Sequence, residues 1–211
     1  MKHRIRKLTA LLLSFSLTAA LTLPAAASNA LGEDLSVKDT PLHQETRLST
    51  NVFWSTAYSD LRTENLITYT PNSAVTPIVT YGDVLTDRSS VAGMAAQLET
   101  EGYRVVAGIN GDFYNVSSGL PIGIVVTEGL LRSSDAGFYA IGFREDGSAI
   151  LGKPGVKVSV NLGYAMDTTD LIRPVAAVNK ARTNSGLYLY TYDFNAKHTT
   201  GTTEPGVNVV C

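Results

Sequence analysis

The sequence predicts a β-rich α+β domain, in which a mixed sheet with hairpins carries one helix packed on it. Short segments rich in β-branched and aromatic residues recur along the chain, separated by Asp, Asn, Pro and Ser. Two Gly-containing turns, Glu128-Gly129 and Asp146-Gly147, lie between apolar runs and indicate hairpins. One stretch, SSVAGMAAQLETEG, has the period of an amphipathic helix.

The first 27 of the 211 residues are typical of a secretory signal peptide. A basic start, MKHRIRK, precedes the apolar run LTALLLSFSLTAALTL and the small residues PAAAS. We expect cleavage after Ala27, because Ala25 and Ala27 fill the small-residue positions. A retained membrane anchor is the alternative, but the run is short for a spanning helix. We therefore expect a secreted or cell-surface protein with no transmembrane segment after cleavage.

Charge and cysteine content narrow the class of protein. Cleavage removes four basic residues, which lowers Lys plus Arg from 17 to 13 against 19 Asp plus Glu. A net charge of −6 without a basic cluster argues against a nucleic-acid partner. The single cysteine, Cys211, is the last residue, so no intrachain disulfide can form. An exported chain without disulfides is ordinary for a bacterial protein.

The middle of the chain divides into a lead and a domain. Residues 28–50 are polar without a clear period, and we expect a flexible N-terminal lead ahead of a domain over 51–211. Strands are expected in VFWSTAY, ENLITYT and VTPIVTYG. The helix should take Ser89 or Ser90 as its N-cap and end at Gly102. Its apolar face would consist of Val91, Met94, Ala95 and Leu98, and the strand YRVVAGI should follow.

The second half is expected to consist mainly of strands. Hairpins are predicted in IGIVVTEGLLRSS and FYAIGFREDGSAILG, and VKVSVNL alternates with period two. Further strands are expected in PVAAVN, GLYLYTYDF and GVNVVC. Because the last of these would leave an unpaired sheet edge, we expect the domain to be truncated at its C-terminus and, as a fragment, to be inactive alone.

The stretch GINGDFYN holds the first candidate site. Asn110-Gly111 has the composition of a type I′ hairpin turn, with Asp112 solvated. Alternatively, Asn110 hydrogen-bonds a ligand, Gly111 admits it to the backbone, and Asp112 acts as an acid, a base or a metal ligand. Phe113 and Tyr114 could then stack on a sugar ring, and the loop VSSGLPIG could supply backbone N–H groups. The local pattern leaves both readings open.

Other polar clusters give weaker evidence for a functional site. In VNKARTNSG, Asn179, Lys180 and Arg182 follow a buried-looking strand, and Arg182 could bind a phosphate in bidentate fashion or belong to a basic turn. Asp167 and Asp170 could form a Ca²⁺ loop, although a polar turn is the simpler reading. Outside the signal peptide only His43 and His198 occur, and no nucleophile, zinc or phosphate-loop motif is present. A histidine-based metal site or a Ser-His-Asp triad is therefore disfavoured.

Taken in order, these pieces resemble the phosphodiester glycosidase family, which includes the lysosomal uncovering enzyme. The resemblance runs from about Arg62 to Cys211. It rests on ENLITYTP, VAGMAAQLETEGYRVVAGINGDFYN, GLPIGIVVTEGLLRSS, FYAIGFREDGSAIL and AAVNKARTNSGLYLYTYDF. Two departures stand out: Asp112 occupies a position that is often a small residue in the family, and the family's later Asp-Gly-Gly-Gly-Ser motif is absent.

The resemblance implies an exported hydrolase that cleaves a sugar-1-phosphodiester bond, with a cell-wall or surface glycan as its carbohydrate substrate. It implies that Asp112 is the catalytic acid or base. It implies that Arg182 holds the phosphate, and that the remaining substrate-binding residues are Asn110, Gly111, Phe113, Tyr114, Gly123 and Asn179. A divalent cation is conceivable, but no ligand cluster predicts a metal site. The alternatives are a non-catalytic extracellular glycan-binding domain and a structural surface domain.

Overall fold

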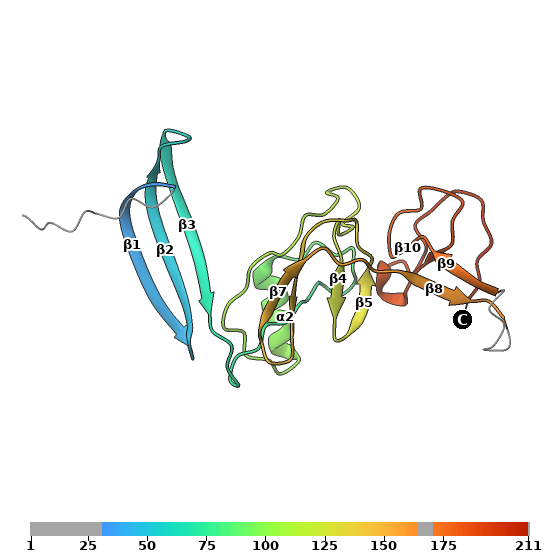
Figure 1. Cartoon of the computed structure of the whole chain (residues 1–211), viewed down its shortest axis with the longest axis horizontal. Coiled ribbons are helices and arrows are strands. Elements are labelled where there is room, and N and C mark those ends of the chain that lie inside the picture. Colours follow the sequence, from blue (N-terminus) through green and yellow to red (C-terminus); the bar gives the residue numbers. More distant parts are fainter. Residues whose placement is uncertain (1–30, 164–170, 211) are drawn as a thin grey trace, which may run out of the picture. The chain divides into compact units, whose positions relative to one another are not determined.

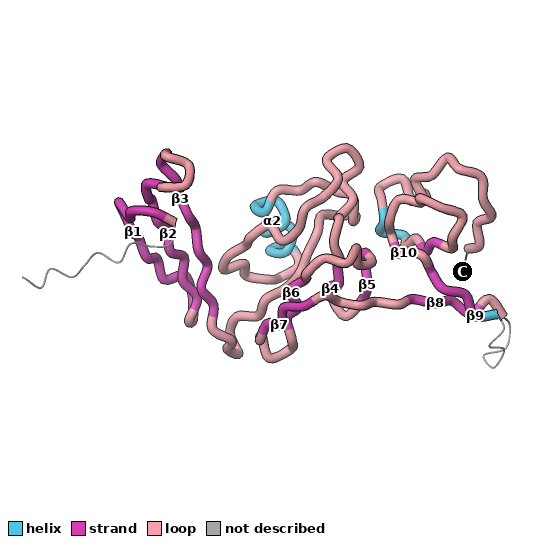
Figure 2. Tube along the Cα trace, turned by 45° about the horizontal axis from the view of Figure 1, so that its top comes forward, coloured by secondary structure: helices cyan, strands magenta, loops and turns pink. Residues whose placement is uncertain are grey.

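The computed structural model describes residues 31–163 and 171–210, and it confirms the β-rich α+β class (Figure 1). Within these described ranges, the strands form a three-stranded sheet and several two-stranded pairs, accompanied by one α-helix (Figure 2). The described residues fall into two compact units. The first comprises residues 31–41 and 47–68, and the second comprises 42–46, 69–163 and 171–210.

The first unit overturns the expected flexible lead over residues 28–50, in the part that is described. Strands β1 (Gly32–His43), β2 (Thr46–Ser55) and β3 (Asp60–Tyr69) form one sheet in the order β1-β2-β3. The expected boundary at Thr50 therefore falls inside β2, and the unit ends near Thr68 instead. The strands expected in VFWSTAY and ENLITYT correspond to the end of β2 and to β3.

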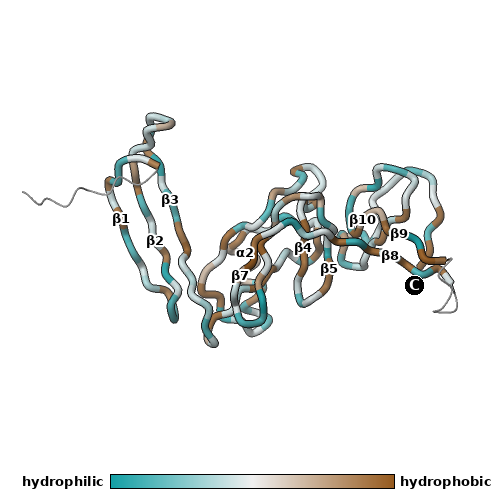
Figure 3. Tube along the Cα trace, viewed as in Figure 1, coloured by the Kyte–Doolittle hydropathy of each residue, from teal (hydrophilic) through white to brown (hydrophobic). Residues whose placement is uncertain are grey.

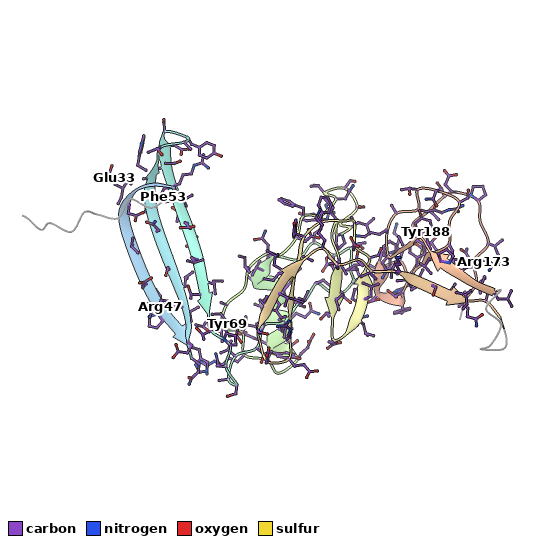
Figure 4. The ribbon with its side chains drawn as sticks, viewed as in Figure 1. Glu33, Arg47, Phe53, Tyr69, Arg173 and Tyr188 are labelled. Carbon is purple, nitrogen blue, oxygen red and sulfur yellow. The ribbon has the colours of Figure 1, made fainter. Side chains whose placement is uncertain are left out.

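Strand β1 was not predicted, because its sequence has little apolar period. Figure 3 shows most of β1 in polar to neutral colours. The strand is held instead by a tight turn, in which Gln44 and Glu45 both have positive φ, and by polar cross-strand contacts. Asn51 donates to Asp34 at 2.7 Å, and the hydroxyl of Ser49 donates to Asp39 at 2.5 Å. Phe53, labelled in Figure 4, is the buried apolar side chain of β2.

Helix α2 (Val91–Thr100) begins and ends where the sequence predicts. Ser90 is its N-cap, and the hydroxyl oxygen accepts the N–H of Gly93 at 3.1 Å. Gly102 follows the C-cap with φ +95°, the left-handed conformation that ends many helices. None of the helix side chains is fully buried, so the apolar face is only partly covered.

Hairpins organise the second unit. Strands β4 (Val125–Thr127) and β5 (Leu130–Ser133) pair across the turn Glu128-Gly129, and β6 (Ala140–Phe143) and β7 (Ala149–Gly152) pair across the predicted Asp146-Gly147 turn. Both hairpins are confirmed. Both Glu128 and Gly129 have positive φ, as a type I′ turn requires.

The remaining strands are short. Strand β8 (Val158–Asn161) pairs antiparallel with β9 (Ile172–Val175), and β10 (Ala177–Val178) pairs parallel with β11 (Tyr188–Leu189). A 3₁₀ turn, η2 (Tyr192–Phe194), follows. Leu85, Val178 and Phe194 are the buried apolar side chains described in this unit.

Three expected strands are not formed. YRVVAGI, VTPIVTYG and the described part of GVNVVC lie in irregular structure. A strand requires a hydrogen-bonded neighbour, and none of the described strands pairs with these segments. The apolar run 103–109 is also more exposed than expected, since Ile109 is 75% exposed.

Candidate functional site

The segment Gly108–Asn115 is not a hairpin turn. A type I′ turn needs positive φ at both central residues, and neither Asn110 nor Gly111 has it. Both residues are exposed and lie in irregular structure. The hairpin reading of this stretch is therefore wrong, and the reading as the edge of a site stays open.

A short loop follows, and Asn115 organises it. Its Oδ1 accepts the N–H groups of Ser117 and Ser118 at 3.0 and 3.1 Å. Its carbonyl oxygen accepts the N–H of Gly119 at 2.7 Å. The expectation that this loop offers backbone N–H groups to a ligand is wrong for these three, because Asn115 already occupies them. Gly119 is required here, since it has φ +76° and an added Cβ would lie 2.0 Å from the carbonyl oxygen of Thr86.

Asp112 ties the two sides of the loop together. Its Oδ1 accepts the N–H of Phe113 at 2.7 Å, and its Oδ2 accepts the N–H of Gly123 at 2.6 Å. A single β-bridge between Tyr114 and Pro121 lies next to these bonds. The N–H of Ile122 donates to the carbonyl of Phe113 at 3.0 Å. We name residues 110–123 the lip. Two backbone N–H donors fix the orientation of the Asp112 carboxylate within it.

Lys180 joins the lip from the end of β10. Its Nζ donates to the carbonyl oxygens of Pro121, Ile122 and Gly123 at 2.7, 2.9 and 2.9 Å. Burial lowers the pKa of Lys180 to about 8, although the negative charges of Asp112 and Asp135 act to raise it. Two carboxylates thus lie close enough to influence one half-buried ammonium group.

The effect of Asp135 on Lys180 was not predicted from the sequence. It lies just after β5, is partly buried, and accepts the N–H of Gly137. The dipeptide Asp-Ala resembles many turns, so no local pattern distinguishes this aspartate. Only the folded chain brings it near Lys180, which lies 45 positions further along.

Asn179 points away from solvent, although its predicted role was substrate binding. It is 1% exposed, and its amide donates to the carbonyl of Arg132 at 2.8 Å and to the hydroxyl of Thr191 at 2.7 Å. Its Oδ1 accepts the N–H of Thr191 at 2.9 Å. The side chain therefore joins β5 to the segment after β11 and is not available to a ligand in this conformation.

Arg182 is also largely engaged. Its Nε donates to the carbonyl of Asn184 at 3.1 Å, and its Nη1 donates to the carbonyl of Pro205 at 2.8 Å. The adjacent N–H of Thr183 donates to the hydroxyl of Tyr188, which Figure 4 labels in β11. Hydrogen bonds therefore hold the segment between β10 and β11 in place. Bidentate phosphate binding by Arg182 requires some of these bonds to break.

Asn179 is connected through Thr191 to a second polar cluster, which the sequence did not predict. The Asp193 carboxylate accepts the hydroxyls of Tyr81 and Thr191, each at 2.5 Å, and pairs with Nη1 of Arg132 at 2.8 Å. We name these four residues with Asn179 the inner network. Desolvation raises the pKa of Asp193, but the hydrogen bonds from Thr191 and Tyr81 and the charge of Arg132 outweigh it, so the pKa lies below its ordinary value.

The same cluster raises the pKa of Tyr81 to about 12, through burial first and then through its hydrogen bond to Asp193. Within the network, Nε of Arg132 is buried without a hydrogen-bond partner among the described residues. The cluster links residues between 81 and 193, which explains why no sequence motif revealed it.

No metal centre is found among residues 31–163 and 171–210, where no group of three potential ligands gathers. Asp167 and Asp170, the candidate Ca²⁺ loop, lie outside the described residues. His198 stacks on Tyr192 with ring centroids 3.8 Å apart, which gives it a local structural contact. No helix in the described part of the chain is long and apolar enough to cross a membrane.

Comparisons with known proteins give no relative. No family model matches the sequence, and neither a curated protein nor a solved structure gives a match. The function must therefore be inferred from the residues of this chain.

Proposed function

We propose that the protein is an exported hydrolase that cleaves the bond between the anomeric carbon of a sugar and a phosphodiester oxygen. The observation that carries the proposal is the lip itself, where two backbone N–H groups hold the exposed carboxylate of Asp112 and the ammonium group of Lys180 binds the carbonyls of the same loop. A second carboxylate, Asp135, acts electrostatically on the same ammonium group. Glycosidases of most families use a pair of carboxylates that flank the scissile bond, one as the acid and the other as the base or nucleophile. The pieces that resemble the phosphodiester glycosidase family supply the lip and the Lys180 segment.

The reaction needs one base and a good leaving group. Water attacks the anomeric carbon, one of its protons passes to a carboxylate, and the carbon–oxygen bond breaks with its electron pair left on the phosphate oxygen. Asp112 is our candidate for the base, because its orientation is fixed by two N–H groups while its side chain remains exposed. Asp135 is the candidate for the general acid, which in its protonated form donates its proton to the departing phosphate oxygen.

The substrate would be held by the exposed side of the lip. Phe113 is 83% exposed and Tyr114 is 47% exposed, which suits stacking on a sugar ring. Asn110 would orient the sugar or the phosphate, and Gly111 and Gly123 would allow close approach of the substrate to the backbone. The remaining Nη2 group of Arg182 would contact the phosphate. With an N-terminal secretory signal, a cell-wall or surface glycan is the expected substrate.

The test is hydrolysis of an N-acetylglucosamine-1-phosphodiester by the full chain and by Asp112→Asn and Asp135→Asn. We expect each variant to lose at least about a hundredfold in kcat/KM, the usual contribution of general acid–base catalysis. Glu99→Gln, an exposed acidic residue of α2, is the matched control and should keep full turnover. Turnover that survives both aspartate substitutions would exclude these carboxylates as the catalytic pair.

The exposed aromatic pair also favours a second candidate, a glycan-binding domain without catalysis. That candidate predicts no turnover of any sugar-1-phosphodiester together with measurable glycan binding. It further predicts that Asp112→Asn and Asp135→Asn leave binding within about twofold of the parent protein, since neither carboxylate then acts on a reacting bond. Calorimetric titration with phosphoglycan fragments separates the two candidates.

A further inference from the structure

Lys180 makes a contact that an ordinary surface lysine does not. Three successive backbone carbonyls, those of Pro121, Ile122 and Gly123, converge on its Nζ within 2.7–2.9 Å. An ammonium group has three N–H donors, so the three acceptors use its whole capacity. Among the described residues, no carboxylate lies within the 4.0 Å of an ion pair with it.

One of these three residues, Gly123, also binds the carboxylate of Asp112. The peptide plane between Ile122 and Gly123 carries the Ile122 carbonyl, which accepts from Lys180, and the Gly123 N–H, which donates to Asp112. The plane between Pro121 and Ile122 carries the Pro121 carbonyl, which accepts from Lys180, and the Ile122 N–H, which donates to the carbonyl of Phe113. Rotation of either peptide plane would therefore break a bond on each side. A Cβ added to Gly123 would lie 2.7 Å from Oδ2 of Asp112, so the carboxylate would have to move.

Burying the ammonium group of Lys180 costs free energy, which argues against incidental packing. Burial of a charged amine is unfavourable, and the charged groups near this one are the carboxylates of Asp112 and Asp135. A chain that needed only to fill this space could use an apolar side chain. The unusual feature is the convergence of carbonyl dipoles on one cation.

We propose that Lys180 is a positioning residue: its ammonium group gathers the carbonyls of Pro121, Ile122 and Gly123 and thereby aims the N–H of Gly123 at Asp112. Its effect on the carboxylate passes through the backbone of the lip. The inference about the backbone stands on the geometry alone, and its effect on turnover rests on the proposed function.

The first experiment is residue-resolved amide hydrogen exchange on the full chain with Lys180→Met, which keeps an unbranched side chain without an ammonium group. Loss of hydrogen bonds to a charged group should speed exchange of the Ile122 and Gly123 amides by about tenfold or more. The amide of Gly147, in the β6–β7 turn, should be unaffected, as should all amides in Lys157→Met, an exposed lysine of the same unit. Unchanged exchange at Ile122 and Gly123 overturns the proposal.

Chemical rescue separates the ammonium group from side-chain bulk. Lys180→Cys alkylated with 2-bromoethylamine carries a lysine analogue, and the same variant alkylated with 1-bromopropane carries an uncharged chain of equal length. Only the aminoethyl product should restore slow exchange. Alkylated parent protein corrects for Cys211, the single native cysteine. Restoration by both products would show that packing suffices, and would overturn the proposal.

Turnover gives an independent readout. If the parent protein hydrolyses a sugar-1-phosphodiester, Lys180→Met should lower kcat by about tenfold or more while KM changes little, because a misaligned base affects the transition state more than binding. A loss of kcat without faster exchange at Gly123 overturns the positioning role but leaves the hydrolase assignment intact. Faster exchange at Gly123 in a protein that hydrolyses no sugar-1-phosphodiester would support the positioning role of Lys180 and overturn the hydrolase assignment.

Discussion

Asn179 and Lys180 are neighbours in sequence, yet they serve different parts of the molecule. Asn179 is 1% exposed and lies in the inner network, whereas Lys180 reaches out to the lip. Asn179 has φ +49°, a left-handed conformation that turns the chain just after β10. Two adjacent residues therefore have different structural roles: Asn179 joins buried segments, and Lys180 orders the exposed lip.

The two regions also differ in what holds them. The inner network joins side chains from distant segments through short hydrogen bonds that are largely screened from water. The lip is exposed, and its order depends on bonds between backbone groups and two charged side chains. We therefore expect substitutions in the inner network to affect stability, and substitutions in the lip to affect ligands.

Asn179→Ala should give the largest loss of stability. The change leaves the carbonyl of Arg132 and two polar groups of Thr191 without their partner, and places alanine at a positive φ. We expect the free energy of unfolding to fall by about 3 kcal/mol or more, measured by urea denaturation.

Asn184→Ala is the matched control, because Asn184 is exposed and its side chain accepts one local N–H, from Gly186. Its cost should be about 0.5 kcal/mol. If both asparagine variants unfold at the same urea concentration, Asn179 does not have the structural role described for it.

Asp193→Asn should have the next largest effect, and a pH-dependent one. Asp193 and Arg132 are 25% and 20% exposed, and we expect a loss of about 1–2 kcal/mol at neutral pH. Because the folded-state pKa of Asp193 lies below its ordinary value of 3.8, its charge stabilises the fold above that value. This contribution is lost as the pH falls through the folded-state pKa.

Unfolding curves of the parent protein and of Asp193→Asn should therefore converge in acid. A difference in stability that stays constant down to about pH 2 would mean that the ionised carboxylate contributes nothing specific. Tyr81→Phe, which removes one donor to Asp193, should show a smaller form of the same convergence.

The sequence predicts local features of this molecule better than it predicts which residues meet. Helix α2 and both hairpins follow from short signals: the N-cap Ser90, Gly102, and the Gly-containing turns. These features depend on neighbours within a few residues, where steric rules and local hydrogen bonds dominate. The fold class follows from the same signals.

Long-range features could not be derived in this way. The apolar run 103–109 has the composition of a strand, but composition does not supply a pairing partner. Conversely, β1 is polar and pairs through a turn whose two residues, Gln44 and Glu45, rarely adopt positive φ. Asp135 became a site candidate only through its position near Lys180. In each case the deciding interaction joins residues whose sequence spacing follows no rule.

Raising the pH should change the stability of the parent protein relative to that of Lys180→Met, because Lys180 binds the lip. The folded-state pKa of Lys180 is about 8, below its ordinary value of 10.5, so between these values the unfolded chain binds more protons. The free energy of unfolding of the parent protein must then rise with pH relative to that of Lys180→Met. Below about pH 8 the difference between the two proteins should be constant.

The measurement is urea denaturation of both proteins at several alkaline pH values. Subtracting the variant removes the contribution of tyrosines and other groups that both proteins share. A relative stability that falls as the pH increases would mean that the folded protein holds the ammonium proton more tightly than the unfolded chain does, contrary to the effect of burial.

Phe113→Ala should have the smallest effect on stability and a clear effect on ligands. The ring is 83% exposed, so the free energy of unfolding should change by no more than about 0.5 kcal/mol. If the ring stacks on a sugar, glycan affinity should fall by about tenfold, the scale of a good aromatic contact. Tyr58→Ala, an aromatic residue of the first unit that is 70% exposed, is the control and should bind glycan normally. Equal glycan affinity in both variants would remove the aromatic part of the lip from the binding site, and the exposed ring would then need another explanation than sugar stacking.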